Sequence, residues 1–330
     1  IKSYQTVMGR SDSTYLNVRI GAPNMDIFLV NEIAANSIIF DNFQIDGNYS
    51  SQANTQNGIV INTPSGPVIY SNIRDGVYIK EMSGYGIKVV GAGMDNSLIN
   101  PFLVRDNKLG NLLVSACDLL EVRGKYRSSK GVSNSIVFDS VNVRSAILVN
   151  VSSDENGGKG LLVSNINTEQ GNVSVQGGSF SRNGGDGLEF DRAFYSSVSG
   201  SLLERNVGDG VSLLDTNGSK VSGNTINANK QRGVLAHRSN DCTITNNYFD
   251  KNSDTNVNVY DDITLITCDN LNIQTNKFRN SLSTTRYNVA VDDAASNDNL
   301  ITNNDFKGAG NTGTLSDAGT GTVIVAGNRT

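Results

Sequence analysis

Apolar residues recur in the second half of the chain at intervals of about two dozen positions. One column has steps of 23, 23, 23, 29 and 28 residues and consists of Val175, Val198, Val221, Ile244, Ile273 and Ile301. A second column, five positions later, consists of Phe180, Leu203, Ile226, Phe249, Phe278 and Phe306. Short apolar segments that alternate with polar residues predict β-strands with one buried face.

Each repeat predicts a further strand eight positions after the second column. It starts at Leu188, Val211, Val234 and Val257, and glycine precedes the first three. Two or three short strands cannot bury an apolar face alone, so successive repeats must stack, with like strands parallel and about 4.8 Å apart. The pattern therefore predicts an all-β fold, a right-handed parallel β-helix with coils of about 23–29 residues.

A column rich in asparagine separates the first two apolar columns. Its members are Gly178, Ser201, Asn224, Asn247, Asn276 and Asn304. Stacked asparagines can bond the turn backbone of their own and the next coil, so we interpret this column as structural. The first half carries a looser repeat, with strands after Gly58, Gly86 and Gly110. We expect a single β-helix domain over 1–330, excised from a longer chain because the pattern is already running at its start.

Composition narrows the function. The net charge is -5 and the pI is near 5.0, without a basic stripe, which argues against nucleic acid. No apolar run is long enough to insert into a membrane. Cys117, Cys242 and Cys268 match no zinc or redox spacing, so we expect buried thiols. We predict no metal or cofactor; calcium stays open, but its nonapeptide repeat is missing.

Side chains on the glycine-initiated strand should alternate in direction. Positions two and four after the glycine should point outward, and position five should lie at the strand edge. Position two holds Glu189, Ser212, Leu235 and Asn258. Position four holds Asp191, Leu214, His237 and Tyr260, and position five holds Arg192, Asp215, Arg238 and Asp261.

These columns predict a candidate active site. Asp191 and Asp215 should lie roughly 5 to 9 Å apart, which spans both carboxylate separations of glycosidases. With Glu189 and His237, the only histidine, they could supply acid, base or nucleophile. Candidate substrate contacts are Arg192, Arg238, Tyr260 and Asp261, the arginines suiting anionic sugars. The alternative interpretation is a solvated ladder of weak salt bridges.

A second charged stretch lies earlier in the chain. It contains Asp118, Glu121, Arg123, Lys125 and Arg127. We interpret it as a solvated loop.

The segments Ile45-Asp46-Gly47-Asn48 and Asn57-Gly58-Ile59-Val60-Ile61, followed by repeated coils, resemble the pectate-lyase-like superfamily. Phage tail-spike and pre-neck appendage proteins belong to it. The resemblance implies a homotrimer, outside the cell or on a virion surface, that binds and often depolymerises a host surface glycan.

The run Glu81-Met82-Ser83-Gly84-Tyr85-Gly86 is similar to the stretch leading into the active site of alginate (mannuronan) C5-epimerases. In that family Phe-Asp-Pro-His follows the Tyr-Gly, and a second Asp lies one coil on. Here Tyr85 is retained, but Lys88, Val90 and Val114 stand at the first Asp, the His and the second Asp. Because valine is neither acid nor base, the resemblance implies the scaffold without its catalytic groups.

The leading hypothesis is an enzyme that binds and hydrolyses an extracellular polysaccharide at the predicted site, with Tyr85 and Lys88 as further substrate contacts. A binding rod without catalysis is the first alternative. An epimerase or polysaccharide lyase is the second.

Overall fold

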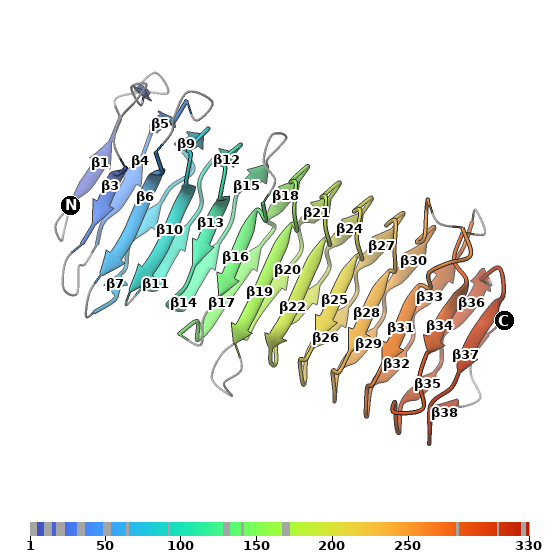
Figure 1. The fold of residues 1–330 in the computed structure, drawn as a ribbon. Coiled ribbons are helices and arrows are strands. Elements are labelled where there is room, and N and C mark those ends of the chain that lie inside the picture. Colours follow the sequence, from blue (N-terminus) through green and yellow to red (C-terminus); the bar gives the residue numbers. More distant parts are fainter. Residues whose placement is uncertain are drawn as a thin grey trace. The chain divides into compact units, whose positions relative to one another are not determined.

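The computed structural model contains β-strands as the only regular elements in the residues that it describes (Figure 1). These residues are 5–9, 15–17, 24–31, 37–48, 54–63, 66–91, 93–127, 133–139, 142–166, 172–255, 257–281, 284–308, 310–324 and 328–329. The chain divides into two compact units, residues 1–162 with 170–173 and residues 163–169 with 174–330. The expectation of one domain stays a prediction.

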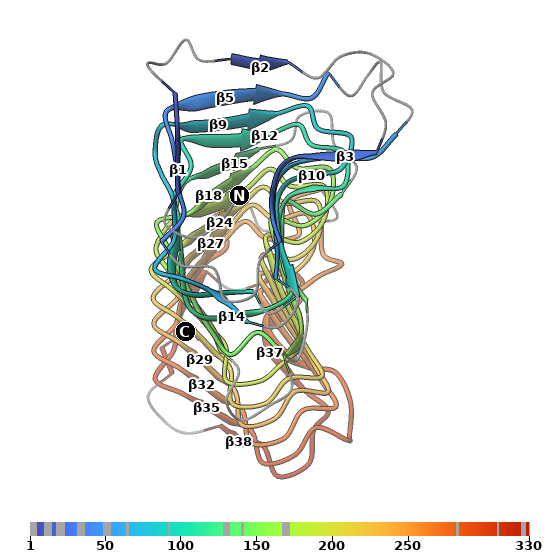
Figure 2. The same cartoon turned by 90° about the vertical axis from the view of Figure 1, so that its left-hand side faces the viewer.

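In each unit the chain passes through three parallel sheets in turn, here called sheets A, B and C. One passage through all three makes a coil, so neighbouring strands of a sheet come from successive coils. This arrangement confirms the predicted parallel β-helix. Figure 2 shows β29, β32, β35 and β38 of the second unit one behind another in sheet A.

The strands of the first unit are given sheet by sheet. Sheet A contains β1 (Thr6–Met8), β4 (Ile39–Asp41), β8 (Asn72–Ile73), β11 (Met94–Ile99), β14 (Cys117–Val122) and β17 (Ser145–Val149), and β7 (Val68–Ile69) pairs with β11. Sheet B contains β2 (Tyr15–Asn17), β5 (Phe43–Asp46), β9 (Val77–Lys80), β12 (Leu103–Arg105), β15 (Lys125–Arg127) and β18 (Ser152–Asp154). Sheet C contains β3 (Met25–Val30), β6 (Gln56–Thr63), β10 (Tyr85–Gly91), β13 (Gly110–Val114) and β16 (Ile136–Asp139).

The strands of the second unit follow the same order, and the first two residues of β19 and of β20 still belong to the first unit. Sheet A contains β20 (Asn172–Gln176), β23 (Ser197–Ser199), β26 (Lys220–Ser222), β29 (Thr243–Thr245), β32 (Asn272–Gln274), β35 (Leu300–Thr302) and β38 (Val323–Ile324). Sheet B contains β21 (Ser179–Ser181), β24 (Leu202–Glu204), β27 (Thr225–Asn227), β30 (Tyr248–Asp250), β33 (Lys277–Arg279) and β36 (Asp305–Gly308). Sheet C contains β19 (Leu161–Ile166), β22 (Leu188–Ala193), β25 (Val211–Leu214), β28 (Val234–His237), β31 (Ile263–Ile266), β34 (Tyr287–Val291) and β37 (Gly313–Asp317).

Both apolar columns predicted from the repeat form the core of the second unit. Val198 pairs with Val221, and Val221 with Ile244, so the column lies in register across sheet A. The aromatic column continues through sheet B, where the Phe249 and Phe278 rings stack with centroids 4.9 Å apart. Because like side chains lie over one another, inward valine, isoleucine and phenylalanine form continuous buried columns.

The asparagine column is a buried hydrogen-bonded ladder, as expected. Asn247 shows the pattern: its Nδ2 donates to Val221 O at 2.9 Å and to Asn276 Oδ1 at 3.1 Å. Its own Oδ1 accepts from the N–H and the Nδ2 of Asn224. A second ladder, through Asn183, Asn206, Asn229 and Asn252, repeats the geometry at the turn before sheet C. The ladders satisfy turn backbone that would otherwise be buried without partners.

Two expectations from the sequence are wrong. The last of the four strands predicted from Leu188, Val211, Val234 and Val257 is β31, which begins at Ile263. Ile263 pairs with Val234, whereas Val257 is 59% exposed. That coil has six extra residues before β31, so its strand does not start eight positions after the second apolar column. The charged stretch from Asp118 to Arg127 is not a loop either, because its residues form most of β14 and all of β15.

Candidate active site on sheet C of the second unit

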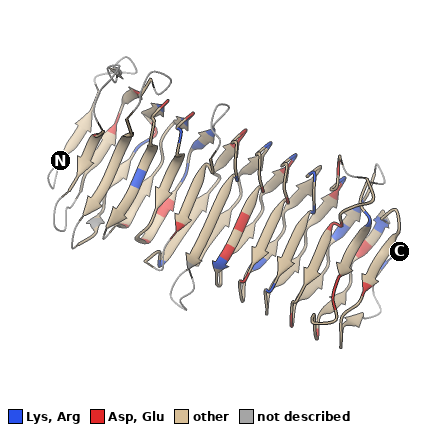
Figure 3. Cartoon of the chain, in the orientation of Figure 1, with Lys and Arg blue, Asp and Glu red and all other residues tan. Residues whose placement is uncertain are grey.

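The backbone register brings five of the predicted site residues together at the ends of β22, β25 and β28. We call them the carboxylate-guanidinium cluster: Asp191, Arg192, Asp215, His237 and Arg238. Leu213 and Ala236 point into the core, so the alternating residues Asp191, Leu214 and His237 face outward in one column. Figure 3 shows acidic positions followed by a basic one along β22.

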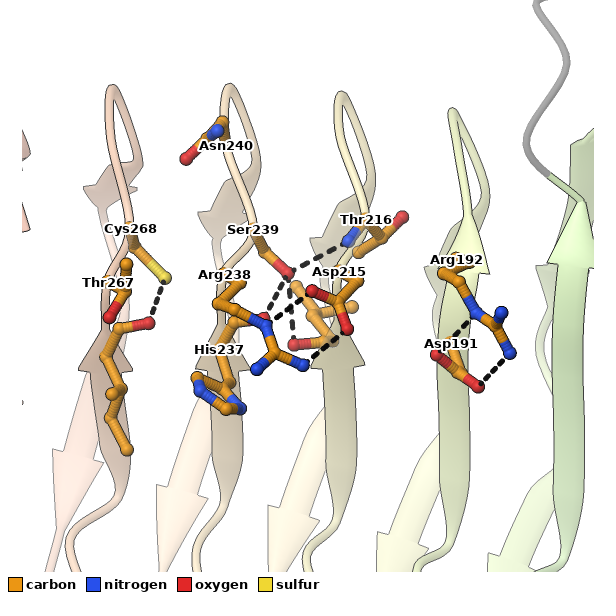
Figure 4. A network of polar contacts seen from close by, with 12 residues as sticks. Asp191, Arg192, Asp215, Thr216, His237, Arg238, Ser239, Asn240, Thr267 and Cys268 are labelled. Carbon is orange, nitrogen blue, oxygen red and sulfur yellow. Dashed lines mark hydrogen bonds and ion pairs between the residues drawn. The ribbon is translucent and has the colours of Figure 1, made fainter.

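Two guanidinium groups engage the two carboxylates of the cluster in different ways (Figure 4). Arg238 reaches back one coil and forms a two-pronged pair with Asp215, with Nε to Oδ1 at 2.6 Å and Nη2 to Oδ2 at 2.7 Å. Arg192 contacts its neighbour Asp191 at 3.4 Å through both nitrogens. The first pair is short and well directed, and the second is long, so Asp191 is held less firmly than Asp215.

The cluster is one electrostatic unit. The hydrogen bonds from Arg238 lower the pKa of Asp215 below its ordinary value, with help from the charges of Arg238, His237 and Arg192. The pKa of Arg238 is raised, chiefly by Asp215 and also by Asp191. Asp215 is therefore ionised at neutral pH and is suited to a base or an anionic stabiliser rather than to a proton donor.

Position five after the glycine lies where the chain bends away from the strand. Arg192, Asp215 and Arg238 all have φ of 50°, and Thr267 has φ of 55°. This left-handed conformation is unusual for residues other than glycine and asparagine. It recurs on successive coils, so the coil geometry imposes it and sets where these side chains leave the backbone.

Glu189 does not lie on an open surface, contrary to the prediction. Its side chain is buried, with 7% exposure, and Ser212 beneath it is 2% exposed. The Ser212 hydroxyl lies 3.1 Å from Asp186 Oδ2 and 3.3 Å from Asp209 Oδ2, so groups of the preceding turn cover this column. Outward alternation in a strand therefore did not mean access to solvent.

Tyr260 and Asp261 also lie outside the cluster, because the six extra residues shift the register. His237 pairs with Ile266, not with Tyr260. Tyr260 and Asp261 precede β31, at the opposite end of a four-residue strand, which is about 13 Å long at 3.3 Å per residue. Asn258, assigned with them to an outward strand position, lies in the same insertion.

The turns before sheet C hold a column of charged residues that the sequence reasoning did not single out. Asp186, Asp209, Arg232 and Asp261 occupy it on successive coils. Asp186 Oδ1 accepts the N–H of Asp209, and Asp209 Oδ1 accepts the N–H of Arg232, both at 2.7 Å. These carboxylates thus tie each turn to the next, and the Asp-Gly pairs at 186–187 and 209–210 were the signal for it.

Burial dominates the acid-base behaviour of Asp209 in this column and of Asp262 beside it. It raises the pKa of Asp209 to about 7, with a further contribution from Asp186, although Arg232 Nη1 lies 3.7 Å away. Burial also raises the pKa of Asp262 to about 7 against the hydrogen bonds from Asn252 and Asn288. On the same turns, the Arg232 guanidinium lies over the Tyr260 ring, and Arg286 pairs with Asp261 at 2.7 and 2.9 Å.

Tyr85 and Lys88 belong to the first unit, where both lie on β10 of sheet C. Burial raises the pKa of Tyr85, and the charge of Asp139 adds to it. Lys88 pairs with Val60 and Leu113 and is half-buried. Val114, at the second Asp position of the epimerase motif, is a core residue with no exposure, so this position cannot contact a substrate.

Two cavities of the first unit are lined by described residues. One, of about 290 Å³ on sheet A, is lined by Pro67, Gly91, Asp95, Ala116, Cys117, Asp118, Asn142 and Arg144. Asp95 and Asp118 are direct partners on β11 and β14, and burial followed by the charge of Asp118 raises the pKa of Asp95. The other, of about 430 Å³ on sheet B, is lined by Gln44, Asp75, Gly76, Tyr78 and Phe102.

Within the described residues, no group of three or more His, Cys, Asp or Glu side chains is arranged to hold a metal ion. No helix in this part of the chain could cross a lipid bilayer. Cys117, Cys242 and Cys268 are free, buried thiols, as predicted.

Residues 125–264 match the family described as a right-handed beta helix region. The chain is a right-handed parallel β-helix. This confirms the handedness and the fold class predicted from the repeat. No curated protein sequence matches the chain significantly.

Solved structures share the right-handed parallel β-helix. The A-module of the mannuronan C-5 epimerase AlgE4 from Azotobacter vinelandii aligns with a TM-score of 0.66 and 16% identity, covering 100% of this chain and 84% of that one. The receptor-binding domain of the siphovirus 9NA tailspike aligns with a TM-score of 0.56 and 8% identity, covering 99% of this chain and 79% of that one. The Dettilon tailspike protein aligns with a TM-score of 0.52 and 12% identity, covering 99% of this chain and 62% of that one. At these identities the likeness establishes the fold.

Proposed function

We propose that this β-helix binds an extracellular polysaccharide on the outward face of sheet C in the second unit and hydrolyses its glycosidic bonds at the carboxylate-guanidinium cluster. The observation that carries the proposal is the cluster itself: two carboxylates and the only histidine of the chain on three successive coils. The structural likeness to a polysaccharide epimerase and to tailspikes supports the substrate class.

The geometry assigns different roles to the ionisable groups. Asp215 is kept ionised by Arg238, so it activates a water molecule by accepting its proton. The water oxygen bonds to the anomeric carbon while the glycosidic bond breaks. The leaving oxygen takes a proton from the acid, for which His237 and Asp191 are the two candidates because both face outward in one column.

The partners and positions of the remaining predicted residues decide which of them belong to the proposed site. Arg192 is the guanidinium of the cluster with the weaker carboxylate contact, so it is better able than Arg238 to bind an anionic sugar. Glu189 is buried, and Tyr260 and Asp261 lie at the other end of the strand. We therefore leave these three out of the proposed site. Tyr85 and Lys88 stay proposed substrate contacts of the first unit.

A binding protein without catalysis is the second candidate. The two-pronged pair between Arg238 and Asp215 favours it, because a satisfied ion pair on the surface needs no catalytic role. In that case the protein would act as an adhesin or receptor-binding rod. The tail-spike resemblance extends either proposal to a homotrimer outside the cell or on a virion surface.

The decisive experiment is incubation with alginate and with neutral and anionic bacterial surface polysaccharides. Hydrolysis releases new reducing ends without absorbance near 235 nm, whereas a lyase would produce that absorbance. We expect Asp215→Asn to lower turnover about 100-fold or more, and one of His237→Gln and Asp191→Asn to do the same by removing the acid, in the range for loss of an acid or base.

The matched control is Asp305→Asn. Asp305 is also a surface aspartate paired with an arginine, Arg279, which likewise lowers its pKa, but it lies on sheet B. It should leave turnover unchanged. Unaltered cleavage by all three cluster variants would remove the cluster as the active site, and glycan binding without products would leave the binding role.

A further inference from the structure

The cavity on sheet B of the first unit, here called the aromatic pocket, has the composition of a ligand site. Its volume is about 430 Å³, and Gln44, Asp75, Gly76, Tyr78 and Phe102 line it. Sites for small ligands are typically concave, mostly apolar and marked by a few polar groups. The aromatic pocket combines two aromatic rings with one amide and one carboxylate.

Neighbouring strands of one sheet hold the lining residues in place. Gln44 on β5 and Tyr78 on β9 are direct partners, and Tyr78 pairs with Leu103 on β12. Phe102 immediately precedes β12, and its N–H donates to Val77 O at 2.9 Å. The two rings therefore come from successive coils, about 4.8 Å apart, a step close to the length of one sugar ring in an extended chain.

Cationic side chains fix both rings. Arg105 Nε donates to the Tyr78 hydroxyl at 2.6 Å, and its guanidinium lies 5.8 Å from the centre of that ring. Lys125 Nζ lies 5.9 Å from the centre of the Phe102 ring. These contacts restrict the rings before any ligand arrives, which reduces the entropy lost on binding.

Phe102 is 54% exposed, which is a large apolar surface for a chain without tryptophan. Nothing in the core requires an outward phenylalanine here, because Val104 and Tyr126 fill the interior of these coils. A pyranose presents a face of C–H groups that packs flat on such a ring. The exposed ring thus suits a sugar better than a charged or fully polar ligand.

The polar lining favours an uncharged sugar. Asp75 is exposed, and its carboxylate has no hydrogen bond or ion pair among the residues that the structure describes. Two oxygens of a free carboxylate can accept from two neighbouring hydroxyl groups of one pyranose. Arg105 and Lys125 contact the rings but are not part of the lining, so Asp75 is its only charged residue and its carboxylate would repel that of a uronate.

We propose that the aromatic pocket binds neutral pyranose units of a polysaccharide, with Phe102 and Tyr78 as the stacking surface and Asp75 as the hydroxyl acceptor. This deepens the proposed function and rests on its substrate class. It assigns a binding site on sheet B that is separate from the cluster on sheet C of the second unit.

The test is binding of neutral hexasaccharides of glucose, mannose and galactose, and of hexamannuronate, to the full chain by calorimetry and saturation-transfer NMR. We expect at least one neutral probe to bind and hexamannuronate to bind at least tenfold more weakly. Phe102→Ala should weaken neutral binding at least tenfold, whereas Phe102→Tyr, which keeps the ring, should stay within threefold. Asp75→Asn should reduce the difference in affinity between the neutral hexasaccharide and hexamannuronate.

Tyr70→Ala is the matched control. Tyr70 is 65% exposed in the same unit but lies between β7 and β8, outside the pocket lining, so its loss should not change binding. The proposal is overturned if no neutral probe binds, if Phe102→Ala binds as well as the parent, or if Tyr70→Ala weakens binding equally. Asp215→Asn should keep this binding, because Asp215 lies outside the pocket lining. Binding that depends on Phe102, in a protein that cleaves none of the polysaccharides named for the cluster, would refute the hydrolase proposal and support the pocket.

Discussion

Asp209 illustrates how burial controls a single residue of this fold. The residue is 3% exposed and its carboxyl group has a pKa of about 7, so the native protein holds a proton there under mildly acidic conditions. The unfolded chain releases that proton near pH 4. Between these values the native state binds more protons, so the free energy of unfolding falls as the pH rises from about 4 to 7.

Replacing Asp209 with Asn should flatten this part of the pH dependence, since the amide resembles the protonated acid. The contribution removed should be at most about 4 kcal/mol between pH 4 and 8, at about 1.4 kcal/mol per pKa unit. Urea unfolding at pH 4.5, 6 and 8 measures it. Asp305→Asn is the control of opposite sign: its pKa is lowered, so its contribution is present at neutral pH and is lost on acidification. A parallel shift of the Asp209→Asn curve at all pH values would contradict this account.

Individual site residues were predictable only where the repeat was regular. Asp191, Asp215 and His237 lie on consecutive coils of 23 residues, and counting from the glycine placed them correctly. The register predicted for Glu189 was correct, but its accessibility was not, because side chains of the preceding turn bury it. Such cover comes from residues of other coils, which a single-strand pattern does not reveal.

At the scale of the element, the asparagine ladder is the main structural device of the turns before sheet B. Removing the Asn247 side chain would leave the N–H of Asn224 and the carbonyl of Val221 without this partner in a buried turn, whereas Oδ1 of Asn276 keeps the N–H of residue 247. We expect Asn247→Ala to lower the free energy of unfolding by about 2–4 kcal/mol, which corresponds to one to two buried groups left unsatisfied.

Asn272→Ala is the matched control for the ladder. Asn272 lies on β32 one coil further along, but its Oδ1 is buried without a hydrogen-bond partner. Its loss should cost less than about 1 kcal/mol because no partner is stranded. Chemical unfolding of both variants compares them, and equal costs would show that the ladder adds nothing beyond packing.

The lengths of the elements were less predictable than their order. The step of 29 residues between Ile244 and Ile273 shows that one coil is longer, but not which of its three turns holds the extra residues. They lie before β31, so Tyr260 and Asp261 were assigned to the wrong end of the strand. The predicted loop from Asp118 to Arg127 failed for a related reason: charged residues alternate outward on β14 and β15.

At the scale of the whole molecule, the three cysteines report on both units. Cys117 belongs to the first unit, and Cys242 and Cys268 belong to the second. Burial raises the pKa of all three thiols, to about 12 for Cys242 and about 11 for Cys268. Since the thiolate is the reactive form, native protein at pH 8 should resist alkylation.

Alkylation with iodoacetamide across a denaturant series, read by mass spectrometry, should label Cys117 at a lower concentration than Cys242. The reason is that the second unit carries two long asparagine ladders. Each unit of a stacked-repeat fold has its own stability, so the two thiols can open separately. Labelling of any cysteine without denaturant, or of Cys242 first, would refute the prediction.

The charged residues at the bend after three strands of sheet C restrict how a polymer can lie across this face. Arg192, Asp215 and Arg238 leave the backbone in the same conformation on three coils, so their charges alternate at a constant step. Within these three coils, a bound polymer that slipped by a single coil would exchange an arginine beneath it for an aspartate, or the reverse. A slip of two coils, from Arg192 to Arg238, places an arginine beneath it again, whereas one coil beyond Arg238 the uncharged Thr267 ends the alternation.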